Sequence, residues 1–409
     1  MHRACITLVS IALLLSTTAL QAVILYSGDN SANQTAPDTA RTDVFHAVAR
    51  VCDNGGGNTR GSAVHIRGKY LLTANHVSLR SHVTFDGVTY WARDTSFTPI
   101  TFASIDMKLF KLVDDPGLPG VQLYTGTQET PYRSRGSWQY TTATLVGWGR
   151  GRDPADASGP TWDWGNGTTH AKRWGENRIE ASLSLSYPLG NLSYNYTALR
   201  TQLDDNAGND EAASALYDSG SGIFVEDQGI WKLAGLTTAV QTSGSSTFAS
   251  PGDQNYFVRI TSYAADIEAA IPDTTTYAGW KLDHSLSGAP DDSDDDADGI
   301  ELLLEFALGG DPTENDLSIL PVQAFTEDSG STYLELSLTR PDDLQGIIYT
   351  PQTTTDLSAW PTDSTGIADP SPTAVDNGDG TETLSYRRAQ AVSGADKAFI
   401  RVDVSESTP

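Results

Sequence analysis

Short apolar runs separated by Gly, Asn, Asp and Pro dominate the first two thirds of this chain. Turn residues recur about every ten positions, a spacing that predicts the strands of an all-β barrel or sandwich. A short helix is expected after the last of these runs, at residues 264–270. The predicted strands lie at residues 45–51, 61–66, 69–73, 82–85, 88–92, 107–113, 122–125, 142–148, 179–187, 192–199, 231–240 and 256–261.

A second region with strand periodicity follows nearer the C-terminus. Apolar and polar residues alternate with a period of two, which predicts a small antiparallel β-sandwich module over residues 321–409. Its strands are expected at residues 333–338, 346–350, 382–387 and 397–404. The intervening residues 273–320 are expected to form a linker that contains a helix.

The first 22 residues have the organisation of a secretory signal peptide. His2 and Arg3 give a basic start, residues 6–20 form an apolar run, and Ala22 provides the cleavage point. That run is too short for a membrane span, and no later segment is apolar enough for one. We therefore expect secretion, to the extracellular space or a periplasm, with a retained N-terminal anchor as the alternative. Residues 23–42 are polar and expected to be flexible.

The cysteines and one Trp-rich stretch give two further predictions for the first region. Cys5 lies in the signal peptide, so Cys52 is left alone and no internal disulfide is expected. Cys52 ends an apolar run with no motif around it, which favours a buried strand thiol over a nucleophile. Residues 149–178 are rich in Gly and Trp and predict a long surface loop, whose rings pack beneath it or line a cleft.

Acidic residues concentrate at the C-terminal end of the chain. Residues 289–409 hold 25 Asp and Glu against 5 Lys and Arg, which is −20 of the formal net charge of −26. This balance argues against nucleic acid and anionic membranes as partners, and favours calcium binding or solubility.

The acid run at residues 291–298 contains a calcium-loop pattern. Carboxylates stand at positions one, three, five and twelve of the pattern, and a glycine stands at position six, where the loop turns sharply. An apolar run at 300–308 continues as a helix that ends at Gly309. The stretch resembles the Asp-rich repeats before the C-terminal modules of exported bacterial proteins, and a solvated acidic linker is the alternative. The expected Ca²⁺ ligands are the side chains of Asp294, Asp296, Asp298 and Glu305 and the carbonyl of Ile300.

Candidate chemistry centres on the turn Asp218-Ser219-Gly220-Ser221-Gly222. Two glycines lie within three residues of Ser219, so the backbone of the turn can adopt conformations that are closed to other residues. A serine on such a turn, ahead of a buried strand, can offer its hydroxyl to a cleft and its N–H to an oxyanion. Upstream, Thr73-Ala74-Asn75-His76 and Asp106-Met107-Lys108-Leu109 supply a histidine and an aspartate. With Gly147-Trp148-Gly149, these segments resemble the trypsin-like serine protease family in sequence and in order. The resemblance covers residues 44–271, within a predicted domain at 43–272.

The resemblance implies a two-barrel, chymotrypsin-like fold and a role for each matching residue. Ser219 is expected as nucleophile, His76 as general base and acid, and Asp106 as the group that orients the imidazole. Ser221 is rejected because no aspartate precedes it. The oxyanion hole is expected from the N–H groups of Ser219 and Tyr217. Tyr217 replaces the family's glycine, and the sequence leaves open whether its amide is twisted away, a change that would weaken the hole by roughly 3–4 kcal/mol if one donor were lost.

Two further features separate this chain from trypsin itself. No Ile-Val-Gly-Gly start is recognisable, so the family's activation route, a cut N-terminus beside Asp218, stays open, with another cation or no partner beside Asp218 as the alternatives. In the specificity pocket, Ala213 stands where a basic-specific enzyme carries an acid, and a glycine of the wall strand is replaced by Val240. We expect small or medium apolar P1 residues, with substrate contacts from Ala213, Thr238, Ala239 and Val240.

The sequence thus predicts a secreted bacterial serine endopeptidase that acts on protein or peptide substrates and binds calcium. Two alternatives stay open. One is an inactive pseudoprotease that binds peptides, motivated by Tyr217 and by the missing activation start. The other is a calcium-dependent surface-binding protein on a protease scaffold. The task of the C-terminal module, whether attachment to a cell surface, sorting or substrate binding, is not readable from the sequence.

Overall fold

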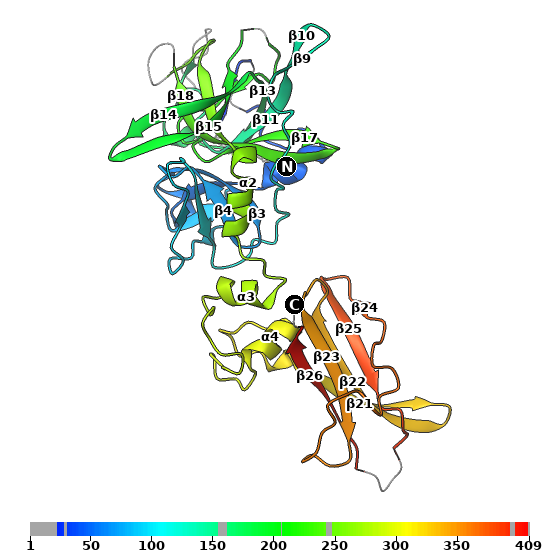
Figure 1. Ribbon diagram of the computed structural model, residues 1–409. Helices are drawn as coiled ribbons and strands as arrows, with labels where there is room; N and C mark the ends of the chain where they lie inside the picture. The colour runs from blue at the N-terminus through cyan, green and yellow to red at the C-terminus, as the bar shows by residue number, and fades with distance from the viewer. Residues whose placement is uncertain are drawn as a thin grey trace, which may run out of the picture. The chain divides into compact units, whose positions relative to one another are not determined.

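The computed structural model describes residues 23–27, 31–153, 162–205, 207–242, 248–392 and 397–407. The chain divides into two compact units, Met1–Ala270 and Ile271–Pro409, and each is described by itself (Figure 1). Antiparallel strands build both units, which confirms the predicted all-β class. Among these residues, no helix has the length and apolar character needed to cross a membrane.

The first large sheet of unit 1 has seven antiparallel strands and carries two of the candidate site residues at its strand ends. Its core is a buried apolar cluster that includes Val51, Leu71 and Phe110. β4 and β8 pair so that Thr73 faces Lys108, which brings the loop after β4 beside the loop before β8. The sheet order is β6 (Trp91–Ala92), β5 (His82–Thr84), β2 (Val48–Cys52), β3 (Gly61–Arg67), β4 (Tyr70–Thr73), β8 (Lys108–Lys111), β7 (Ile100–Thr101).

The second large sheet of unit 1 also has seven antiparallel strands, drawn mostly in green in Figure 1. Its core includes Leu145, Leu199, Ile223 and Phe257, all buried. The two sheets correspond to the two barrels predicted for a chymotrypsin-like fold, and the short helix α2 (Ala264–Ala270) follows the second. The sheet order is β13 (Arg173–Ile179), β11 (Thr141–Gly147), β17 (Gly222–Asp227), β18 (Ile230–Gln241), β20 (Gln254–Arg259), β15 (Leu192–Gln202), β14 (Ala181–Leu189).

Smaller elements of unit 1 correct two sequence predictions. The described part of residues 23–42 is ordered, because Val23, Ile24 and Leu25 are buried and β1 pairs with β16. Residues 149–178 are not one surface loop, since β13 begins at Arg173. The short elements are β1 (Ile24–Leu25), α1 (Thr42–His46), β9 (Tyr132–Ser134), β10 (Ser137–Gln139), β12 (Trp162–Asp163), β16 (Ala212–Ala213), β19 (Phe248–Ala249) and 3₁₀ turns at Thr39–Arg41, Asn54–Gly56, Gly167–Thr169 and Ile260–Ser262.

Unit 2 joins two short helices to an antiparallel β-module. α3 (Tyr277–Asp283) and α4 (Leu302–Leu308) pack through a buried aromatic cluster that includes Trp280 and Phe306. α4 begins two residues later than expected and ends at Gly309, whose φ of 80° caps the helix. The module consists of one sheet, β21 (Val322–Asp328), β22 (Ser331–Pro341), β25 (Thr381–Arg387), β24 (Val375–Asp376), one pair, β23 (Ile347–Thr354) with β26 (Phe399–Glu406), and a 3₁₀ turn at Leu317–Ile319.

Candidate active site

The three predicted catalytic side chains meet in unit 1 and form a continuous line of polar contacts. His76 follows β4, Asp106 precedes β8 and Ser219 precedes β17. The imidazole Nε2 lies 2.8 Å from the Ser219 Oγ, and its Nδ1 lies 2.6 Å from an Asp106 carboxylate oxygen. The other Asp106 oxygen accepts the His76 backbone N–H at 3.0 Å. Hydroxyl, imidazole and carboxylate therefore stand in the arrangement that proton transfer from the serine requires.

Asp106 is fully buried and receives a hydrogen bond that the sequence did not predict. The Tyr187 hydroxyl, on β14, donates to the carboxylate at 2.6 Å. Burial, together with the Asp106 charge, raises the pKa of Tyr187, so its hydroxyl stays protonated and remains a donor. Such donors stabilise a buried carboxylate, because they replace the hydrogen bonds that it would make with water. No local motif marks Tyr187, because the contact crosses 81 residues of sequence.

Lys108 supports the histidine loop from the adjacent strand. Its Nζ donates to the Asn75 carbonyl at 2.9 Å and to the Val77 carbonyl at 2.6 Å, on either side of His76. Burial lowers the pKa of Lys108 to about 8, with Asp106 opposing the shift. The ammonium thus fixes the backbone that carries the imidazole. The sequence places Lys108 beside Asp106 but does not reveal this contact.

Backbone contacts connect the serine turn to both large sheets of unit 1, through Ser62 on β3 and Thr237 on β18. The Ser62 N–H donates to the Ser219 carbonyl at 2.8 Å, and the Gly220 N–H donates to the Thr237 carbonyl at 2.7 Å. Gly220 has a φ of 85°, and a Cβ there would lie 2.2 Å from the Ser62 carbonyl oxygen. Only glycine fits this approach. Ser221 is buried and bonds to the Thr237 hydroxyl at 2.7 Å, so its hydroxyl is engaged away from His76.

Tyr217 adopts the left-handed conformation that a glycine would adopt at the same place. Its φ is 74°, a region that costs an L-residue roughly 1–2 kcal/mol. Its ring packs against His170, at 5.1 Å between centroids, and beneath the Arg150 guanidinium at 5.1 Å. Burial lowers the pKa of His170 to about 4, so that imidazole is neutral. Packing of the ring thus supports a backbone shape that the side chain alone disfavours.

A cavity of about 200 Å³ opens beside Ser219. Three of the predicted substrate contacts, Thr238, Ala239 and Val240, line this cavity. Trp164 lines it too, which agrees with the alternative that rings of the Trp-rich stretch line a cleft. No charged side chain of the described residues lines it. Ala213 does not line it either, because it pairs with Ile24 in the β1–β16 ladder and is buried. The remaining lining residues are Ala215, Leu216, Tyr217, Ser219, Thr237 and Thr242.

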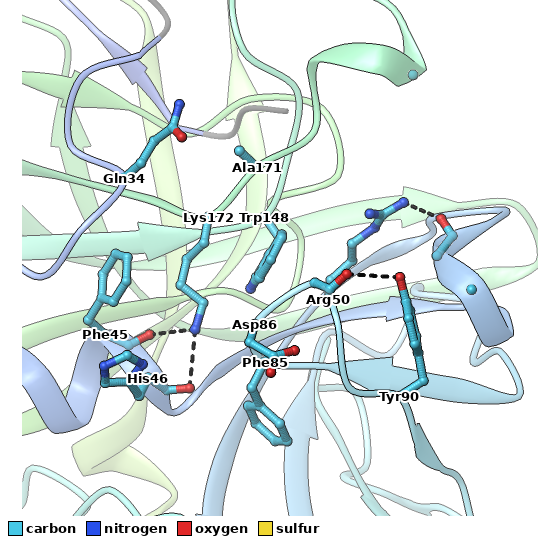
Figure 2. Close-up of a pocket in the computed structure, with 14 residues that line it drawn as sticks. Gln34, Phe45, His46, Arg50, Phe85, Asp86, Tyr90, Trp148, Ala171 and Lys172 are labelled. Atoms are coloured by element: carbon cyan, nitrogen blue, oxygen red, sulfur yellow. Dashed lines mark hydrogen bonds between the residues drawn. The ribbon is translucent and has the colours of Figure 1, made fainter. Parts of the chain in front are cut away.

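A larger cavity, of about 680 Å³, lies elsewhere in unit 1 and includes none of the three catalytic candidates (Figure 2). Its cationic groups already have protein partners. Lys172 donates to the carbonyls of Phe45 and His46 at 2.9 and 3.2 Å, and burial lowers its pKa to about 7. Arg50 donates to Thr59 at 2.6 Å and to a backbone carbonyl. The ammonium of Lys172 and the guanidinium of Arg50 are thus already engaged by the protein. Cys52 is buried, and burial raises the pKa of its thiol to about 11, which makes it a poor nucleophile.

The acidic loop of unit 2 brings carboxylates together in two overlapping groups. One group is Asp294, Asp296 and Asp298, and the other is Asp298, Glu305 and Asp316, with ligand oxygens within 4.8 Å in each. Glu305 is 1% exposed, and neither of its oxygens has a hydrogen-bond partner among the described residues. Burial and the neighbouring carboxylates raise its pKa to about 7. Asp316 lies outside the loop pattern and was not predicted as a ligand.

Comparisons with known proteins give a match among solved structures. No family model matches the chain, and no curated protein matches it. Among solved structures, the chain is similar to neuropsin, a serine protease expressed in the limbic system of mouse brain, with a TM-score of 0.39 and 14% sequence identity. The match covers 58% of this chain and 97% of neuropsin.

Proposed function

We propose that the protein is a serine endopeptidase whose nucleophile is Ser219. The observation that carries this proposal is the hydrogen-bonded line from the Ser219 hydroxyl through His76 to the buried Asp106. Three residues from three loops, up to 143 positions apart, converge with distances of 2.6 to 2.8 Å. A structural role alone gives no reason for an imidazole to bridge a hydroxyl and a buried carboxylate.

Each residue has a defined part in the proposed reaction. His76 takes the Ser219 proton as the oxygen attacks the peptide carbonyl, and later gives that proton to the leaving amine. Asp106 holds the tautomer with the proton on Nδ1 and stabilises the imidazolium. A water then hydrolyses the acyl-enzyme by the same route.

The oxyanion hole is proposed to use the N–H groups of Ser219 and Tyr217. Neither group donates a hydrogen bond to any atom in the described parts of the chain. The φ of 74° gives Tyr217 the conformation that glycine adopts readily, which supports a working hole despite the side chain. Two preorganised donors stabilise the developing oxyanion by several kcal/mol.

The specificity proposal is cleavage after small or medium apolar residues. The cavity beside Ser219 holds about 200 Å³ and is lined by apolar and hydroxyl-bearing side chains. Among the described lining residues no carboxylate is present to pair with an Arg or Lys of a substrate. The Val240 side chain reduces the volume that this cavity leaves for a P1 side chain. Export by a signal peptide remains part of this proposal.

Hydrolysis of casein and of peptides tests the enzyme proposal. Activity is expected in the native chain and absent in Ser219→Ala. Ser221→Ala is the matched control, because it removes a neighbouring hydroxyl that bonds Thr237 rather than His76. A folded native chain without hydrolysis would favour the pseudoprotease alternative.

A second proposal concerns calcium in unit 2. The orphaned, buried Glu305 carboxylate favours a bound cation over a solvated acidic linker, because such a group needs a partner charge. Oxygen ligands of this kind suit Ca²⁺. The proposed ligands are the side chains of Asp294, Asp296, Asp298, Glu305 and Asp316 and the carbonyl of Ile300. The ion would join the loop to α4 and would take no part in peptide hydrolysis.

A further inference from the structure

The peptide group before Tyr217 determines where the N–H of this residue points. Its carbonyl, which belongs to Leu216, accepts the Arg150 N–H at 2.8 Å. The peptide bonds of the described residues are trans, so the Tyr217 N–H lies on the opposite edge of the same planar group. This N–H therefore points away from Arg150, and it donates to no atom of the described residues. It is left free for the oxyanion of a substrate.

The peptide group after Tyr217 is held at both of its edges. The Asp218 N–H donates to the Ala215 carbonyl at 3.0 Å. On the opposite edge, the Tyr217 carbonyl accepts the Ser62 hydroxyl at 3.2 Å. Because both flanking peptide groups are held, φ and ψ of Tyr217 are fixed, with φ at 74°. Among the hydrogen bonds that the described residues make to these two groups, only the one from Ser62 comes from a side chain.

Ser62 lies on β3, between the two loops that carry the proposed nucleophile and base, and is fully buried. Its Oγ accepts the Trp148 N–H at 3.1 Å, so the proton of the hydroxyl is left for the Tyr217 carbonyl. Its backbone N–H donates to the Ser219 carbonyl at 2.8 Å. Its own carbonyl accepts the Thr73 hydroxyl at 2.7 Å, at the end of the strand that leads to the histidine. One buried serine thus contacts both residues of the proposed oxyanion hole.

Tyr217 needs support that a glycine at the same place would not need. Glycine adopts a positive φ readily, whereas the Cβ of an L-residue disfavours it. A rotation that relieves this crowding would turn the Tyr217 N–H away from the position where an oxyanion develops. The hydrogen bond from Ser62 opposes that rotation at the carbonyl, and the packing of the ring on His170 opposes it at the side chain.

We propose that Ser62 is a positioning residue that keeps the Tyr217 N–H in the oxyanion hole and so permits a residue other than glycine there. Ser62 does not line the cavity beside Ser219, and it acts through the Tyr217 carbonyl. The inference rests on the proposed protease function. A serine that only stabilised the fold would contribute equally whether residue 217 is tyrosine or glycine, so the two roles predict different results.

The test is a double-mutant cycle on the full chain, measured by peptide hydrolysis. Ser62→Ala is expected to lower kcat about three- to tenfold, the effect of one neutral hydrogen bond. KM is expected to stay within about twofold, because the oxyanion develops only on the way to the transition state. In the Tyr217→Gly background, Ser62→Ala is expected to lower kcat by less than about twofold, because glycine keeps this φ without support. The Trp148 N–H loses its acceptor in both backgrounds, so that cost cancels in the comparison.

A peptide boronate gives a second reading that does not depend on turnover. The Ser219 oxygen adds to the boron while its proton passes to His76, and the tetrahedral anion places an oxygen in the oxyanion hole. Ser62→Ala is expected to weaken boronate binding about three- to tenfold. Ser221→Ala is the matched control, because its buried hydroxyl bonds Thr237. The control is expected to keep boronate affinity within about twofold and to change kcat equally in both backgrounds.

Circular dichroism establishes that each variant is folded, and the outcomes then separate the two proposals. An equal loss of kcat in both backgrounds, or native boronate affinity in Ser62→Ala, overturns the positioning role and leaves the protease function standing. A folded, inactive Tyr217→Gly chain also overturns it, because the tyrosine side chain would then itself be required. If Tyr217→Gly does not fold, the boronate affinities of Ser62→Ala and Ser221→Ala decide. A folded native chain that neither hydrolyses peptides nor binds the boronate overturns the protease function instead.

Discussion

Removal of one hydroxyl from Tyr187 tests how Asp106 is held. In Tyr187→Phe, the buried carboxylate loses the donor at 2.6 Å and keeps the two contacts from His76. A hydrogen bond to a charged group contributes about 1.5–3 kcal/mol, and 1.4 kcal/mol corresponds to about tenfold in rate. We expect a loss of stability within that range and a fall of about tenfold in kcat.

The kinetic pattern separates this effect from general damage. Tyr187 does not line the cavity beside Ser219, so KM is expected to stay within about twofold while kcat falls. The Nδ1 proton resonance of His76 is expected to move, because its acceptor changes. Tyr256→Phe is the matched control, since it removes a hydroxyl of the same sheet that bonds Gln254 at 2.6 Å. Unchanged kcat and stability in Tyr187→Phe, measured by peptide hydrolysis and urea unfolding, would refute the reasoning.

Three further predictions follow from the cavity, the acidic loop and one buried acid. A peptide-library profile is expected to show small or medium apolar P1 residues, and to shift to larger P1 residues in Val240→Gly. A profile dominated by Arg and Lys would contradict the proposed specificity. Millimolar Ca²⁺ is expected to raise the melting temperature of unit 2 in the full chain. Glu305→Gln should abolish this rise, whereas the control Glu301→Gln, at an exposed position, should keep it. An equal rise in the two variants would count against the proposed calcium site. Burial raises the pKa of Glu211 to about 7 in the folded chain, against about 4.5 in the unfolded chain. The protonated side chain therefore contributes roughly 2–3 kcal/mol to the free energy of unfolding below pH 4.5, and this contribution is lost as the pH rises through 7. Urea unfolding should therefore show that the stability of unit 1 at pH 8 relative to pH 5 is lower in the native chain than in Glu211→Gln, and an identical pH dependence in the two chains would exclude this cause.

Short motifs predicted the candidate site because each stands at the end of a strand. His76 and Asp106 follow and precede apolar runs that form β4 and β8, and these strands are neighbours in the first sheet. The strand periodicity was strong enough to indicate an all-β chain, and the antiparallel sheets confirm it. Local sequence therefore contained both the chemistry and the elements that carry it.

Contacts between distant strands could not be predicted in this way. Tyr187 reaches Asp106, and Asp316 joins Glu305, through tertiary packing that leaves no periodic trace in the sequence. Ala213 was predicted as a substrate contact by counting six positions back from Ser219, and this prediction is not met by the cavity. The residue lies on β16, where it pairs with Ile24. Fixed offsets hold only where the intervening turns have the lengths of the family.

The N-terminal segment shows how composition can hide a strand. Residues 23–42 are polar on average, yet their first three residues are apolar and buried. Three residues are too few to stand out by periodicity, and their partner strand begins at Ala212, far along the chain.

The most direct test of the account is the site at which a fluorophosphonate probe attaches to the full chain. Mass spectrometry of the labelled peptides is expected to find the adduct on Ser219, with no labelling in Ser219→Ala and little in His76→Ala, because the hydroxyl is activated by the imidazole 2.8 Å away. A folded chain that takes up no probe, or an adduct on Ser221 or another serine, would contradict the proposed triad.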